Sequence, residues 1–110
     1  MKKFENLYIE DAIESAQKAI RYLNNVSYEE FMSGDEMVRD AILRCVEIVG
    51  EALKNIDKEM RDQNPQIPWR SAIGMRDKVI HDYGWVEWRT VYNTVKDDYP
   101  KLIAMLSELV

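Results

Sequence analysis

Apolar residues recur every three or four positions along most of this 110-residue chain, and that spacing restricts the fold more than any other feature. It is clearest over residues 6–26 and 36–62. Side chains at these intervals lie on one face of an α-helix and need a second apolar surface to cover them. No segment alternates convincingly with the period of two that β-strands show. The pattern therefore predicts an all-α fold.

Residues typical of helix ends divide the chain into helices joined by short loops. Asn24 and Asn25 are expected to end the first helix, Ser27 and Glu30 have the spacing of a capping box, and Asp35 is suited to cap the second long helix. The expected elements follow in chain order. They are a first helix within 6–26 that stops at Asn24 and Asn25, a short turn after Ser27, a long helix over 36–62, a proline-containing loop over 63–68, a helix over 69–84 ended by Gly84, a helix over 86–98, and a last helix opened by Pro100.

These elements predict an antiparallel up-and-down helical bundle of four to five helices, in a single domain spanning residues 1–110. Gly50 lies inside the second long helix, where it costs about 1 kcal/mol relative to alanine. Its presence indicates a close approach between two helices. The alternative is that this glycine has no structural role and its cost is simply tolerated.

Composition limits the function. The formal net charge of −5 argues against broad coating of nucleic acid, although it allows a small basic site. The only cysteine, Cys45, cannot form an internal disulfide, and this favours a cytoplasmic protein. Its side chain is expected in the core. The two lysines near the start are not followed by an apolar stretch, and no run approaches membrane-spanning length, so neither a signal peptide nor a membrane role is predicted.

The segment RDKVIHDYG at 76–84 holds the only histidine, with Arg76 five residues before His81 and Tyr83 two after it. Histidine titrates near neutral pH and suits a general acid or base, and arginine binds phosphate oxygens in pairs. Metal-free RNA cleavage needs a base for the 2′-hydroxyl, an acid for the leaving 5′-oxygen and a cation for the charged phosphorane. One chain supplies one histidine, and a homodimer would supply two.

On a continuous helix, His81 would lie about 140° around the axis from Arg76, so one rigid helix does not easily aim both at one atom. Either the helix loosens near Gly84 or a second copy contributes its residues across a two-fold axis, which we favour. The structural alternative is that His81 caps a helix end and that Arg76 pairs with Asp77 or Asp82.

Other chemistries fit less well. A zinc site needs several His or Cys ligands, and the chain has one of each, so neither a metal site nor a cofactor is predicted. The three tryptophans are expected to be core or interface anchors, with base stacking as a second option. They are Trp69, Trp85 and Trp88.

The R-x4-H-x-Y pattern of residues 76–83 resembles the signature of the HepT toxins of the HEPN superfamily. The resemblance extends to AILRCVEIVGEAL at 41–53, PQIPW at 65–69 and DDYPKLIAMLSEL at 97–109. It implies a HEPN-like bundle that dimerises, and a metal-independent RNA endonuclease of a type VII toxin–antitoxin system. Arg76 and His81 would be catalytic at the inter-subunit cleft.

The resemblance also implies a partner, an MntA-like minimal nucleotidyltransferase that inhibits the toxin by adding AMP to Tyr83, the tyrosine that would also position substrate. The family often has asparagine where this chain has Asp77. On a helix Asp77 would face His81 and orient it, but it would also place negative charge near the phosphate. Glu51 is expected either to reach the inter-subunit cleft or to have a structural role at a helix–helix contact.

Two alternative functions remain: a non-catalytic HEPN module that binds and regulates a nucleotidyltransferase, and a helical adaptor without a nucleic-acid role.

Overall fold

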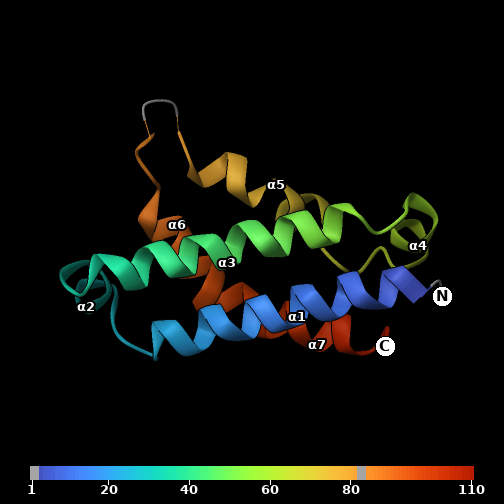
Figure 1. Cartoon of the computed structure of the whole chain (residues 1–110), viewed down its shortest axis with the longest axis horizontal. Coiled ribbons are helices and arrows are strands. Elements are labelled where there is room, and N and C mark those ends of the chain that lie inside the picture. Colours follow the sequence, from blue (N-terminus) through green and yellow to red (C-terminus); the bar gives the residue numbers. More distant parts are fainter. Residues whose placement is uncertain (1–2, 82–83) are drawn as a thin grey trace.

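The computed structural model describes residues 3–81 and 84–110 and shows an antiparallel up-and-down arrangement of long helices (Figure 1). The long helix α1 runs in one direction and α3 returns beside it, while α5 lies on the other side of α3 (Figure 1). The chain then comes back through α6 and α7, and α7 packs on α1. The elements are α1 (Lys3–Leu23), α2 (Tyr28–Ser33), α3 (Glu36–Lys54), α4 (Lys58–Gln63), α5 (Trp69–Val79), α6 (Trp88–Asn93), a π-helical turn η2 (Thr94–Asp98) and α7 (Tyr99–Ser107). The all-α prediction is confirmed.

Local sequence signals define the end of α1 and the start of α2. Asn24 and Asn25 have φ of 52° and 54°, a left-handed conformation that asparagine tolerates and that a continuing helix does not allow. Ser27 then caps α2: its Oγ accepts from the Glu30 N–H at 3.1 Å, and Glu30 Oε1 accepts from the Ser27 N–H at 3.1 Å. The predicted capping box is confirmed, as is the cap at Asp35, whose carboxylate accepts from Met37 N–H at 2.9 Å.

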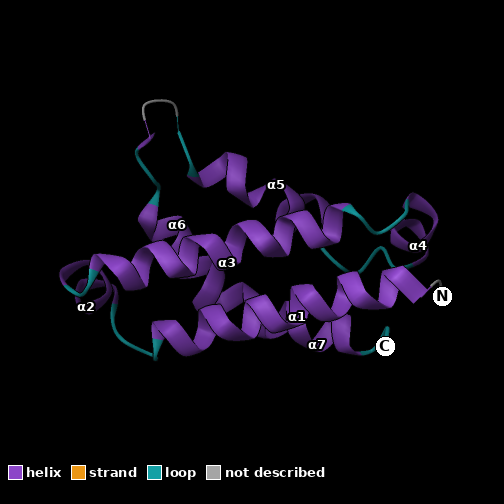
Figure 2. Ribbon diagram, viewed as in Figure 1, coloured by secondary structure: helices purple, strands orange, loops and turns teal. Residues whose placement is uncertain are grey.

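The second long helix is shorter than predicted. It ends at Lys54, and a separate short helix, α4, begins at Lys58, with loops on both sides of α4 (Figure 2). The Asp57 carboxylate caps α4 by accepting from Met60 N–H at 2.9 Å, a capping geometry that excludes Asp57 from a continuous helix. Ile56 is still buried in the core, so the apolar stripe continues although the helix does not.

The last two predicted helices form one continuous helical path. The N–H of Tyr99 donates to the Thr94 carbonyl, the five-residue step of a π-turn, and α7 begins there. Pro100 has no N–H to donate and lies in the first turn of α7, as expected. A π-turn immediately before the proline lets the helical path continue.

The core lies between α1, α3 and the α6–α7 segment. Gly50 is buried where α3 meets α5, and a Cβ placed there would lie 3.1 Å from the Ile73 carbonyl oxygen and 3.3 Å from that of Ala72. Close helix–helix approach is therefore the reason for glycine at this position. Cys45 is buried as expected, and burial raises the pKa of its thiol.

Candidate active site

Helix α5 ends five residues earlier than predicted, at Val79, so His81 is not helical. The residues after the helix, 80–81 and 84–87, fold back on themselves; we call them the His81 turn. Ile80 and Val86 form an antiparallel bridge, and Glu87 N–H donates to the Val79 carbonyl at 2.8 Å. Beyond Val79, this pairing takes the place of the backbone hydrogen bonds that a continuing helix would form. Tyr83 lies outside the described residues.

Hydrogen bonds within the turn fix the backbone of His81. Its N–H donates to the Trp85 carbonyl at 3.0 Å, and its carbonyl accepts from Gly84 N–H at 3.1 Å. Gly84 has φ of 82°, a conformation that glycine adopts without a steric penalty. Gly84 therefore terminates the segment by enabling the return of the chain, rather than by capping a helix.

The His81 imidazole lies between an aromatic ring and a carboxylate. The Trp85 indole stacks on it with ring centroids 4.0 Å apart and an interplanar angle of 8°. The Nε2 atom lies 3.9 Å from Glu87 Oε1, which is within ion-pair range but too long for a hydrogen bond. Although the side chain is 38% exposed, Nε2 itself is covered and has no hydrogen-bond partner among the described residues. A protonated ring would thus be attracted to Glu87.

Arg76 lies in the last turn of α5 and reaches across to α3. Its Nε lies 3.2 Å from Glu47 Oε2, and its Nη1 lies 3.3 Å from Asp77 Oδ1. The ion pair with Asp77 is the structural alternative expected for this arginine. The Arg76 side chain nevertheless remains 51% exposed, so these contacts orient it without removing it from solvent.

The acidic residue beside His81 is not the one that sequence reasoning selected. Asp77 was expected to face His81 one helical turn later, but α5 ends before His81, and the contact that the structure shows for the Asp77 carboxylate is with Arg76. Glu87 takes that place in space. Glu87 was missed because only the backbone pairing of the His81 turn brings it back to the histidine.

Trp85 was expected to be a core or interface anchor, but it is 54% exposed and one face of its ring stacks on His81. The other two tryptophans fit the expectation better. Trp69 is buried, and Trp88 packs edge-on against Phe31 at 6.0 Å between centroids. Trp85 is therefore an exposed aromatic side chain in direct contact with the histidine ring.

Other candidate positions lie elsewhere. Glu51 is exposed, and its carboxylate lies 4.0 Å from Arg44 Nη1 on the same helix.

Among residues 3–81 and 84–110, no three His, Cys, Asp or Glu side chains are grouped so that they could hold a metal ion. None of the described helices is both long and apolar enough to cross a membrane.

Comparison with known proteins identifies the family. The family model described as Ribonuclease HepT-like matches residues 9–109. The chain is 37% identical over 109 residues to a Thermococcus cleftensis protein named "Probable ribonuclease HepT", an alignment that covers 99% of this chain and 98% of the relative.

Two further relatives are provisionally named as RNases. One, from Caldanaerobacter subterraneus, is 34% identical over 94% of this chain and 91% of its own length. The other, from Methanocaldococcus jannaschii, is 38% identical over 86% of this chain and 78% of its own length. No solved structure matches significantly. The chain belongs to the HepT-like family of ribonucleases.

Proposed function

We propose that this protein is the toxin of a type VII HepT/MntA-like toxin–antitoxin system and that it cleaves RNA internally without a metal. The observation that carries the proposal is that the Arg76–His81 pair lies partly exposed at the end of α5 in a chain that matches a ribonuclease family over nearly its full length. A cytoplasmic location agrees with the one unpaired cysteine.

The two side chains divide the work by their chemistry. The His81 imidazole exchanges a proton with the 2′-hydroxyl or with the leaving 5′-oxygen, because an imidazole can act as a base and, once protonated, as an acid. The Arg76 guanidinium binds the non-bridging phosphate oxygens and stabilises the extra charge of the phosphorane. Glu47 and Asp77 both form ion pairs with this guanidinium. An RNA phosphate must therefore compete with these two carboxylates for it. Trp85 and Glu87 position the imidazole.

The reaction requires two proton transfers on opposite sides of the phosphorus, and each chain has one histidine. A homodimer with the two His81 turns at one cleft supplies both. Mixing wild-type with His81→Ala protein tests this arrangement. A mixed dimer has one histidine at the cleft, so activity should fall with roughly the square of the wild-type fraction, whereas a fall in direct proportion to that fraction would contradict a cleft that needs both copies.

The partner is a minimal nucleotidyltransferase of the MntA type, which transfers AMP to Tyr83. The chemistry of the site supports this form of control. Tyr83 follows His81 by two residues, so an added AMP brings a phosphate and a nucleoside next to the imidazole. The added negative charge repels an incoming RNA phosphate, and the added bulk fills the cleft.

A second candidate function is a non-catalytic HEPN module that binds and regulates the nucleotidyltransferase. The observation in its favour is that two carboxylates already contact Arg76. It predicts tight partner binding with no RNA cleavage, and no growth arrest when the protein is expressed alone.

The deciding experiment incubates purified wild-type protein and His81→Ala with tRNA and mRNA in EDTA. Cleavage by the wild type that disappears in His81→Ala, with both proteins melting at the same temperature, is the expected result. Expression without the partner should arrest growth, and the same substitution should relieve the arrest. Wild-type protein that binds the partner but cuts no RNA would instead favour the regulatory module.

A further inference from the structure

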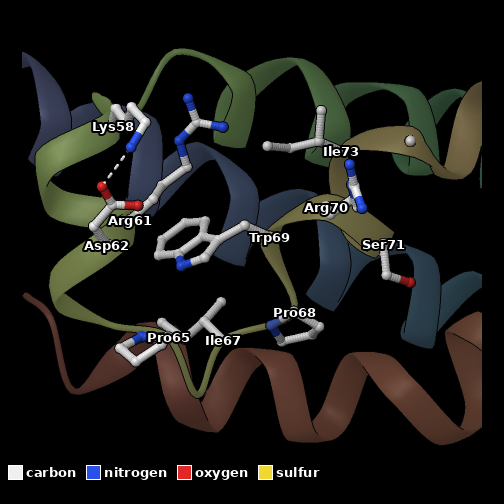
Figure 3. A pocket seen from close by; sticks show the side chains of 11 residues that line it. Lys58, Arg61, Asp62, Pro65, Ile67, Pro68, Trp69, Arg70, Ser71 and Ile73 are labelled. Atoms are coloured by element: carbon white, nitrogen blue, oxygen red, sulfur yellow. Dashed lines mark hydrogen bonds and ion pairs between the residues drawn. The ribbon is translucent and has the colours of Figure 1, made fainter.

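A second candidate site lies at the other end of α5, in an open pocket of about 1300 Å³ between α4, the loop before α5 and the first half of α5. Figure 3 shows the Trp69 indole in the pocket, with the Arg61 side chain above it and Arg70 to the right, beyond the Trp69 backbone. None of these residues belongs to the R-x4-H-x-Y segment.

The pocket carries unpaired positive charge. Lys58 is neutralised by Asp62, with an Nζ–Oδ2 distance of 2.7 Å (Figure 3). In contrast, neither Arg61 nor Arg70 forms an ion pair within the described part of the chain, and Arg61 Nε is covered from solvent without a hydrogen-bond partner there. Two unpaired guanidinium groups at one pocket, on a chain of net charge −5, point to an anionic ligand.

An apolar wall of the pocket is formed around Trp69 and is held in place. The Trp69 indole is fixed because its Nε1–H donates to the Asn64 carbonyl at 3.0 Å, and Pro65 and Pro68 line the wall around it. Gly74 borders the pocket, and a Cβ added there would meet nothing within 4 Å, so space remains beside the helix. Guanidinium groups beside a rigid apolar wall fit a nucleoside phosphate, whose phosphate pairs with arginine and whose base lies against apolar surface.

The pocket and Arg76 share one rigid helix, because Arg70 lies in the first turn of α5 and Arg76 in its last turn. Arg70 and Arg76 are six residues apart on α5, which corresponds to about 9 Å along the axis and about 120° around it. An RNA strand held at Arg70 can therefore reach Arg76 within a few nucleotides if it follows α5 obliquely across its surface.

We propose that the pocket between α4 and α5 binds one nucleoside phosphate unit of single-stranded RNA, a few nucleotides from the bond that is cut. This inference rests on the proposed ribonuclease function and adds a substrate-binding site to it. Arg61 and Arg70 each bind one of the two phosphates that flank this nucleoside, and the wall formed by Trp69 and the two prolines receives the base. The dependence on salt is modest, since two phosphate contacts to a single strand give a slope of about 1.4 in log Kd against log salt.

The test measures binding of a fluorescent, unstructured 12-nucleotide RNA to the full-length protein carrying His81→Ala, so that the RNA is not consumed. In this background Arg61→Ala and Arg70→Ala should each weaken binding about tenfold or more and lower the salt slope by about 0.7. Gly74→Glu, which places a carboxylate in open space, should also weaken binding without lowering the melting temperature. Arg21→Ala, an exposed arginine on α1, is the matched control and should bind like the parent.

In proteins that retain His81, the pocket substitutions should raise KM for RNA and leave kcat largely unchanged. RNA binding and KM equal to those of the Arg21→Ala control would overturn the pocket assignment, while continued His81-dependent cleavage would leave the proposed function intact. If the His81→Ala parent does not bind RNA and the wild-type protein does not cut it, both proposals fail.

Two other occupants give distinct results. AMP that binds the parent protein but not the Arg70→Ala variant, combined with unchanged RNA binding by that variant, would identify a free-nucleotide site and overturn the RNA assignment. If the Arg70→Ala variant no longer binds the nucleotidyltransferase but binds RNA like the parent, the pocket is a protein interface. That result would also overturn the RNA assignment.

Discussion

Replacing Gly50 with alanine is expected to destabilise the protein, although alanine is the better helix former. The added Cβ would lie 3.1 Å and 3.3 Å from two main-chain carbonyl oxygens of α5, closer than ordinary van der Waals contact. Those oxygens belong to a helix backbone and cannot rotate away as a flexible side chain would. The methyl group therefore has to push α5 away from α3 by a few tenths of an ångström.

The size of the effect follows from two opposing contributions. Alanine gains about 0.5–1 kcal/mol because it restricts the unfolded chain and favours the helix. Overpacking a close contact costs about 1–3 kcal/mol. The net loss of unfolding free energy is roughly 1 kcal/mol, and for a domain of this size the melting temperature should fall by about 4–8 °C.

Gly74, on α5, provides the matched control because its Cβ position is open. Gly74→Ala should therefore show only the favourable contribution and raise the melting temperature by a few degrees. Thermal unfolding followed by circular dichroism, supported by urea titration, measures both variants. Equal stabilisation by the two substitutions would mean that α3 and α5 are not in close contact at Gly50, and the packing that brings Arg76 to Glu47 would need to be revised.

Three further predictions concern a cap, a buried phenol and the His81 turn. Ser27→Ala removes one half of the capping box and should cost about 1 kcal/mol of unfolding free energy, measured by urea titration; no change would mean that the cap contributes nothing. Burial raises the pKa of Tyr99 above its usual value of about 10, so the folded state holds this proton more tightly than the unfolded chain does. Unfolding free energy should thus be unaffected by this group below pH 10 and fall as the pH rises further, and the fall should be smaller in Tyr99→Phe; identical alkaline profiles would contradict the assignment. Glu87→Ala should lower kcat for RNA cleavage about three- to tenfold with KM unchanged, and Glu87→Asp should recover part of the loss, whereas a change in KM alone would show that Glu87 does not position His81.

Helix type and several helix ends, chiefly the starts of helices, were predictable because their causes are local. The Ser27–Glu30 box and the paired asparagines each act through hydrogen bonds or backbone angles within a few residues. The break between α3 and α4 was missed because Ile56 continues the apolar stripe across it. Periodicity reports which side chains are buried and does not reveal whether the backbone between them stays helical.

The candidate site was predictable in its residues but not in its geometry. Arg76 and His81 were selected from their spacing, yet the end of α5 depends on bonds that join Val79 to Glu87 and His81 to Trp85. The pocket between α4 and α5 was not predicted either, since its arginines become neighbours only when α4 folds against the start of α5. Contacts of this kind depend on where the chain turns back.

In the proposed mechanism, the 2′-hydroxyl of the RNA attacks the adjacent phosphate. The most direct test is to cut RNA with the purified protein in EDTA and to identify the chemical groups at the fragment ends by mass spectrometry. We expect 2′,3′-cyclic phosphates paired with 5′-hydroxyls, at a rate that falls by about 10²–10⁴ in His81→Ala. Fragments that carry 5′-phosphates, or a His81→Ala variant that cuts as fast as the wild type, would contradict catalysis by the Arg76–His81 pair.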